Sequence, residues 1–275
     1  MPWYLNRSGE QLWYEDQGAG CPVVLVHGWC MSSAVWKYQF EGLSSSMRLL
    51  APDLRGHGRS RGIAGGLNFE GFADDLVDLC EALNLSKIVL VGWSMGAQVA
   101  LQASAELSGR LAGMVLVSAT PRFTASDDFP YALAGTEASG MRLKVQRNTQ
   151  RALDGFYTRL FAEGEFESHS SGAEIKQLLS AIPPPDTAAV LDALDALSRT
   201  DMRGLLPAIP VLTLVVNGSQ DRICLPRAST YLKEHIPDAR QFVFPGCGHA
   251  PFLTRSLQFN AEITRFARSV CAQTV

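Results

Sequence analysis

The sequence predicts an α/β protein with a mostly parallel, eight-stranded sheet flanked by helices, and two patterns carry that prediction. Continuous apolar runs of strand length recur, each closed by a turn signal, as is typical of strands buried on both faces of a parallel sheet. Helix-like stretches lie between many of these runs, and alternation of strands with helices is the signature of an α/β fold. The runs are Pro22–Gly28, Met47–Asp53, Lys87–Gly92, Leu111–Ser118, Pro210–Gly218 and Arg240–Gly246.

Two further strands are expected at the N-terminus. Short segments around Tyr4 and Leu12–Glu15 are joined by Arg-Ser-Gly-Glu, which predicts a hairpin at one edge of the sheet. The hairpin brings the expected number of strands to eight. The main helices of this sheet protein are expected at Phe69–Leu83, Met95–Leu107, Arg227–His235 and, as an amphipathic closing helix, Ser256–Val270.

One region interrupts the alternation after the sixth strand. From about Thr120 to Thr200 the sequence has helical patterns and no buried strand, which predicts a helical cap over residues 120–199. Residues 1–119 and 200–275 would then form the core. Insertions beyond the carboxyl ends of parallel strands are where ligands bind in such folds. The cap helices are expected at Arg142–Phe161, Ala173–Ala181 and Ala188–Ser198.

Composition excludes several classes of function. The 275 residues carry 24 basic and 27 acidic side chains, a net charge of −3, so no basic field attracts nucleic acid. No apolar run reaches the roughly 18 residues of a membrane span. The N-terminus lacks the basic and apolar parts of a secretory signal, which favours a cytoplasmic location.

The cysteines predict neither a metal site nor a disulfide framework. None of the six belongs to a Cys-x-x-Cys pair, and none lies with histidines at metal-ligand spacing. We therefore expect reduced thiols and no metal site among the cysteines. The six are Cys21, Cys30, Cys80, Cys224, Cys247 and Cys271.

The stretch Gly92-Trp93-Ser94-Met95-Gly96 matches G-x-S-x-G between a predicted strand and a predicted helix. A tight turn there would lift Ser94 clear of the sheet, with small flanking residues because neighbouring backbone passes close by. Ser94 is therefore the expected nucleophile, and the Met95 N–H an expected oxyanion donor. Gly58–Gly62 matches the same pattern around Ser60. No buried strand precedes it and no helix follows, so we interpret Ser60 as a loop residue whose hydroxyl satisfies nearby backbone.

A serine nucleophile needs a base, and the base needs an acid to orient it. In α/β proteins with G-x-S-x-G between a strand and a helix, these residues follow one another along the chain in the order Ser, acid, His. His249 fits best, because it lies in a glycine-rich loop after the last strand. The other four histidines fit less well. His27 and His57 precede Ser94, His169 lies in a polar stretch, and His235 lies at the end of an exposed helix.

Asp221 is the expected acid, since it directly follows a buried-type strand and could hold the tautomer of His249. Asp201 and Asp238 remain competitors, whereas Asp53 ends a strand before the serine and breaks the order.

The loop after the Pro22–Gly28 strand should supply the second oxyanion donor, and the Trp29 N–H is the natural choice. We interpret His27 as a structural hydrogen-bonding residue of this turn.

Five motifs in order make the chain resemble the α/β-hydrolase superfamily. Within it, the chain resembles the family of pimeloyl-[acyl-carrier protein] methyl ester esterases of biotin synthesis. The superfamily motifs are VHGW (26–29), DLRGHGRS (53–60), GWSMG (92–96), NGSQD (217–221) and GCGHAPF (246–252). The closer resemblance rests on HGWCMSSAVW (27–36), GRSRG (58–62), GWSMG, VSATPRFTASDDFPY (117–131) and HAPFLT (249–254).

This resemblance implies a cytosolic, monomeric carboxylesterase that cleaves the methyl ester of pimeloyl carried on acyl-carrier protein. It implies the triad Ser94, Asp221 and His249, and no metal or other cofactor. It also implies substrate contacts from Trp29, Ser94 and Met95, and from a cap helix matched by Phe156, Tyr157, Thr158, Arg159 and Leu160. Ala97 replaces a glycine often found after this motif, and the cap sequence diverges from the family.

A basic stripe supports a carrier-bound substrate. Lys144, Arg147 and Arg151 fall on one side of a predicted helix, with Arg142 and Arg159 nearby, and such a face could meet an acidic carrier. A solvated helix face is the alternative interpretation. Leu153, Phe156 and Leu160 would form the apolar side of the same helix and line an acyl channel, pack the cap, or both.

Other activities stay open. A generic short-chain carboxylesterase, a serine-dependent lyase or a carbon–carbon hydrolase would share the triad, and a non-catalytic binding protein could share the scaffold. A dehalogenase or epoxide hydrolase is excluded, because both need a carboxylate where this chain has Ser94.

Overall fold

A computed structural model describes residues 2–63, 65–165 and 171–271. Its core is the expected eight-stranded sheet, in the order β1-β2-β4-β3-β5-β6-β7-β8. The predicted hairpin forms the antiparallel edge, and the strands from β4 to β8 run parallel. The strands are β1 (Trp3–Leu5), β2 (Gln11–Gln17), β3 (Pro22–Val26), β4 (Arg48–Pro52), β5 (Ile88–Trp93), β6 (Leu111–Val117), β7 (Thr213–Gly218) and β8 (Ala239–Phe244).

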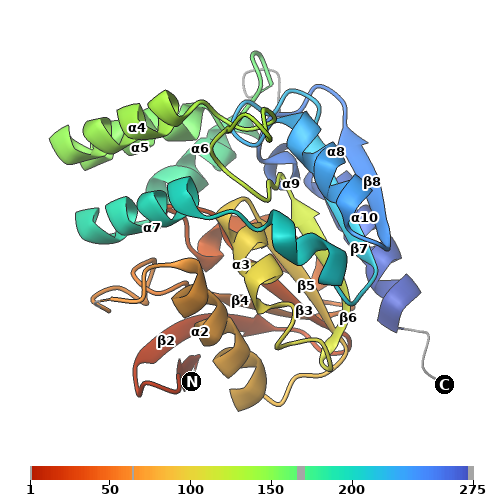
Figure 1. Ribbon diagram of the computed structural model, residues 1–275. Helices are drawn as coiled ribbons and strands as arrows, with labels where there is room; N and C mark the ends of the chain where they lie inside the picture. The colour runs from red at the N-terminus through yellow and green to blue at the C-terminus, as the bar shows by residue number, and fades with distance from the viewer. Residues whose placement is uncertain (1, 64, 166–170, 272–275) are drawn as a thin grey trace.

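Helices cover the sheet and close the chain (Figure 1). Every residue of β5 and β7 is buried, which explains why their sequences are continuously apolar instead of alternating. The helices outside residues 120–199 are η1 (Ser33–Trp36), α1 (Lys37–Leu43), α2 (Phe69–Ala82), α3 (Met95–Ala103), η2 (Arg203–Ala208), α8 (Pro226–His235), α9 (Pro251–Thr254) and α10 (Ser256–Cys271).

Four α-helices of the described residues lie between β6 and η2 in the sequence and stand above one end of the sheet (Figure 1). They are α4 (Gly135–Arg147), α5 (Thr149–Thr158), α6 (Gly172–Ala181) and α7 (Thr187–Arg199). The ranges of α6 and α7 agree closely with those expected from the sequence.

The prediction of a single helix over Arg142–Phe161 is wrong. The chain becomes extended at Asn148 (φ −163°, ψ 97°), and the Asn148 side chain accepts a hydrogen bond from the Arg151 N–H to cap α5. Asparagine is a strong N-cap residue, so it ends one helix and starts the next. The basic stripe is therefore divided, with Lys144 and Arg147 at the end of α4 and Arg151 in the first turn of α5.

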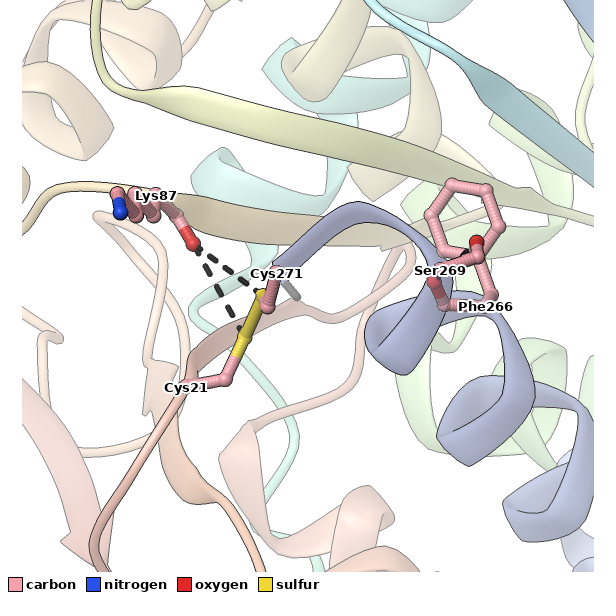
Figure 2. Close-up of a disulfide and its surroundings, with 5 residues drawn as sticks. All are labelled: Cys21, Lys87, Phe266, Ser269 and Cys271. Carbon is pink, nitrogen blue, oxygen red and sulfur yellow. Dashed lines mark hydrogen bonds between the residues drawn. A yellow bond between two sulfur atoms is a disulfide. The ribbon is translucent and has the colours of Figure 1, made fainter. Parts of the chain in front are cut away.

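The expectation of six reduced cysteines is also wrong. Cys21 and Cys271 form a disulfide that joins the start of β3 to the end of α10, 250 positions apart in the sequence (Figure 2). Their Cα atoms lie 6.5 Å apart because α10 returns the chain to the beginning of the sheet. No local spacing reveals such a pair. The other four cysteines are free and buried, at Cys30, Cys80, Cys224 and Cys247.

Reducing the Cys21–Cys271 bridge should lower the melting temperature, because the bridge restricts almost the whole unfolded chain. Loop-closure entropy gives a loss of up to about 5 kcal/mol. Thermal unfolding with and without reductant measures the shift. Cys271→Ser should melt like the reduced wild type and should not respond to reductant. Six reactive thiols in the denatured, unreduced protein would contradict the bridge.

Candidate active site

Ser94 lies at the sharp turn between β5 and α3. Its backbone has φ 55° and ψ −117°, a left-handed conformation that non-glycine residues rarely adopt. Its side chain is half-buried and faces a pocket. The strand–turn–helix context expected from the sequence is thus present.

The glycines around Ser94 are required by close backbone contacts. A Cβ atom at Gly92 would lie 2.3 Å from the Gly96 carbonyl oxygen, and one at Gly96 would lie 2.3 Å from the Val26 carbonyl oxygen. Real Cβ atoms essentially never approach other atoms so closely. Gly28, after β3, is also close: a Cβ atom there would lie 3.3 Å from the Cβ atom of Ser94.

Asp221 and His249 meet as the sequence predicts. Asp221 follows β7, His249 follows β8, and the Nδ1 atom of His249 lies 2.8 Å from Oδ2 of Asp221. The other carboxylate oxygen accepts hydrogen bonds from the Ile223 and Cys224 N–H groups. The carboxylate is therefore fixed by backbone on one side and orients the imidazole on the other.

His249 lies against the residue that precedes Ser94. The rings of Trp93 and His249 have centroids 5.5 Å apart, and the Trp93 indole donates a hydrogen bond to the His249 carbonyl oxygen. Among the described residues, no group hydrogen-bonds the buried Nε2 atom of His249. With Nδ1–H donating to Asp221, the neutral ring carries its lone pair on Nε2, which leaves that atom able to accept a proton.

The two expected oxyanion donors are also uncommitted. Within the part of the chain that the structure describes, neither the Trp29 N–H nor the Met95 N–H donates to another protein group. Trp29 follows β3 and Met95 follows Ser94, and β3 pairs directly with β5. Two free backbone donors at one sheet edge can hold a negatively charged oxygen.

A mostly apolar pocket covers Ser94. Trp29 links the loop after β3 to two of the helices between β6 and β7, since its indole donates to the Val190 carbonyl oxygen of α7 and its ring contacts Phe156 of α5 edge-on at 5.0 Å. The remaining walls come mainly from the segment between β6 and β7 and from the loop after Asp221. They are Phe123, Leu133, Glu137, Ala138, Met141, Arg159, Leu194, Leu197 and Ile223.

Of the five residues 156–160 that were expected to contact the substrate, only two line the pocket. Phe156 and Arg159 line the pocket, and Arg159 pairs with Glu137 at 3.1 Å. The Tyr157 hydroxyl instead donates to the Cys30 carbonyl oxygen, and Thr158 is exposed. The last of the five, Leu160, is fully buried, and its carbonyl oxygen accepts a hydrogen bond from the His249 N–H.

The rejected candidates have structural partners. The Ser60 hydroxyl accepts a hydrogen bond from the Trp13 N–H, as expected for a loop serine. Both ring nitrogens of His27 are engaged by backbone groups, and burial lowers its pKa to about 4. Burial likewise lowers the pKa of His57 to about 3. Asp201 forms ion pairs with two arginines, and His169 lies outside the described residues.

Two residues near the site were not predicted. Burial, followed by the nearby Asp221 carboxylate, raises the pKa of the Cys224 thiol, and hydrogen bonding with Ser94 opposes this shift. Glu165, after α5, accepts a hydrogen bond from the Gly248 N–H beside His249. Glu165 belongs to a polar stretch whose composition is typical of a surface loop, so nothing in the sequence predicts that its side chain is buried beside His249.

Within the described residues, no group of three or more His, Cys, Asp or Glu side chains is arranged to hold a metal ion. None of the helices described there is both long and apolar enough to cross a membrane.

Known proteins match this chain over nearly its full length. The α/β-hydrolase fold family matches residues 22–256. The pimeloyl-[acyl-carrier protein] methyl ester esterase of Nitrosomonas europaea is 32% identical over 249 residues, which cover 89% of this chain and 95% of that protein. The protein of the same name from Nitrosospira multiformis is 30% identical over 259 residues, or 94% and 98% of the two chains.

Solved structures agree with these relatives. An esterase from Exiguobacterium antarcticum has a TM-score of 0.89 at 26% identity, covering 97% of this chain and 98% of that one. A thermophilic esterase from Thermogutta terrifontis has a TM-score of 0.82 at 32% identity, covering 98% and 97%. The family match, the order of the strands and the sharp turn at Ser94 all point to the same fold. The chain belongs to the α/β-hydrolase fold family and is a carboxylic ester hydrolase.

Proposed function

We propose that this chain is a serine esterase that hydrolyses the methyl ester of pimeloyl-[acyl-carrier protein] in biotin synthesis. The observation that carries the proposal is the 2.8 Å contact between Asp221 and Nδ1 of His249. Nε2 of the same ring has no hydrogen-bond partner among the described residues, and the ring packs on Trp93, the residue before Ser94. The names of relatives at about 30% identity supply the substrate. The proposal implies a monomer working in the cytoplasm, with residues 120–199 as its cap.

The geometry supports acyl transfer in two steps. Nε2 of His249 takes the proton as the Ser94 hydroxyl oxygen attacks the ester carbonyl, and Asp221 stabilises the imidazolium that forms. The Trp29 and Met95 N–H groups hold the oxyanion. Methanol leaves with the proton from the imidazolium. Water then attacks the acyl-enzyme, again assisted by His249, and releases the free carboxylate.

Two adjoining features suit an acyl chain on a carrier. The pocket over Ser94 has largely apolar walls that can bury methylene groups. A groove lined by Lys144, Arg147 and Arg151 meets this pocket at Met141 and Arg159, which line both. Within the described part of the chain, none of those three basic side chains forms a salt bridge, so they are available to an acidic surface.

A generic short-chain carboxylesterase is the second candidate. It is favoured by the similarity to solved esterases with TM-scores of 0.89 and 0.82. A serine-dependent lyase or carbon–carbon hydrolase would use the same arrangement. Substrate tests on the intact protein separate these activities.

Ser94→Ala should abolish covalent labelling by a fluorophosphonate and lower kcat by about 10³-fold or more, because the nucleophile is lost. The wild type, but not Ser94→Ala, should restore biotin-independent growth to a bacterial strain that lacks its pimeloyl-ester esterase. Ser60→Ala is the matched control, since Ser60 lies in the same sequence pattern but only bonds backbone. Labelled Ser94→Ala protein would refute the assignment. Wild type that cleaves short-chain esters but fails to restore growth would favour the generic esterase.

Asp221→Asn should lower kcat by about 10³–10⁴-fold, because an amide donor no longer stabilises the tautomer with Nε2 unprotonated. Steady-state kinetics on a simple methyl ester measure the loss. Asp201→Asn is the matched control and should retain wild-type kcat, since Asp201 forms ion pairs with arginines at the cap boundary. Equal losses in both variants would remove Asp221 from its proposed role.

Arg147→Glu/Arg151→Glu should raise KM for the carrier-bound ester by about tenfold and leave kinetics on a free methyl ester unchanged, because only the carrier meets this groove. The difference should shrink as salt increases. Lys233→Glu/Arg240→Glu makes the same charge change at exposed positions at the other end of the sheet, on α8 and β8. If that control raises KM equally, or if the free ester is affected as strongly as the carrier-bound one, the docking surface is wrong.

A further inference from the structure

A buried carboxylate joins the cap to the loop that carries His249. Glu165 follows α5 and is only 5% exposed. Its Oε2 atom accepts hydrogen bonds from the Ala162 N–H at 2.8 Å and from the Gly248 N–H at 2.7 Å. One oxygen atom therefore bridges the cap segment and the residue just before His249.

The other side of the same carboxylate holds the chain that follows His249. The Thr254 hydroxyl, in α9, donates to Oε1 of Glu165 at 2.5 Å. The Cys247 thiol also lies beside it, and burial, followed by the negative charge of Glu165, raises the pKa of that thiol to about 11. Glu165 thus contacts the histidine loop both before and after His249.

The backbone of this loop packs directly against the backbone of residues 160–162 in the proposed cap. The His249 N–H donates to the Leu160 carbonyl oxygen at 2.7 Å. A Cβ atom at Gly248 would lie 2.7 Å from both the Leu160 carbonyl oxygen and the Ala162 nitrogen. Segment 160–165 consequently acts as a support behind the histidine loop, and Glu165 is its anchoring side chain.

We propose that Glu165 is a positioning residue for His249. It holds the backbone next to His249 in the position from which Nε2 can take the proton of Ser94. The Asp221 hydrogen bond orients the ring through Nδ1 but does not fix the backbone of residues 247–249. The Gly248 N–H bond to Glu165 does so from the cap side. A displacement of about 1 Å in a reacting group can cost about 100-fold in rate, so this anchor has kinetic consequences. The inference rests on the proposed role of His249 as the base.

The test compares four full-length variants with a simple methyl ester and a fluorophosphonate. Glu165→Ala removes the acceptor of both N–H groups and should lower kcat and the labelling rate of Ser94 by about 10- to 100-fold, with KM changed less than about threefold. Glu165→Gln keeps a carbonyl oxygen for the two N–H groups and an amide that can donate to Thr254, so it should restore most of both rates. Glu163→Ala is the matched control, an exposed glutamate in the same segment, and should behave as wild type.

Glu165→Asp decides the matter if Glu165→Ala does not fold, because it keeps the charge but withdraws the carboxylate by one methylene. It too should lose kcat and labelling rate at temperatures well below its melting point. Folded Ala or Asp variants with wild-type kcat and labelling rate would overturn the proposal, as would a folded Gln variant that is as slow as Ala. A wild-type protein that the fluorophosphonate fails to label would instead refute the proposed function itself.

Discussion

The turn between β5 and α3 depends on the absence of side chains at Gly92 and Gly96. A Cβ atom at either position would lie 2.3 Å from a carbonyl oxygen, so only glycine lets α3 begin this close to the sheet. The same approach forces Ser94 to φ 55° and directs its side chain into the pocket. Every proposed step of acyl transfer starts from that geometry, because Ser94 is the proposed nucleophile and its side chain faces the pocket.

The loops that follow the strands and the segment between β6 and β7, which includes the proposed cap, both contribute to the candidate site. The Trp29 indole bonds the backbone of α7, and the His249 N–H bonds the Leu160 carbonyl oxygen beyond α5. Glu165 adds a carboxylate beneath the same loop. A shift of the proposed cap would therefore reach the candidate base through these hydrogen bonds, as well as changing the shape of the pocket.

The division of the basic stripe changes how a carrier would be recognised. One continuous helix would present Lys144, Arg147 and Arg151 in a line, whereas the break at Asn148 turns them into the walls of a groove between two helices. This groove shares Met141 and Arg159 with the pocket over Ser94. Arg159 itself pairs with Glu137 at the junction, so the boundary between charged groove and apolar pocket is a salt bridge. An arm carrying an acyl chain would pass that pair.

The sequence by itself determined the sheet, the helical segment between its sixth and seventh strands and the triad candidates, because these depend on local apolar periodicity, turn chemistry and chain order. Ser94 and Asp221 each follow a strand that is buried along its whole length and continuously apolar in sequence, whereas His249 follows the edge strand β8, in which only Phe244 is buried. Tertiary structure decided the Cys21–Cys271 bridge and the partners of Glu165. Both depend on segments that are distant along the chain and meet only when packed, so no local pattern encodes them. The helix break at Asn148 lies between these cases: its capping signal is local, but helical propensity on both sides conceals it.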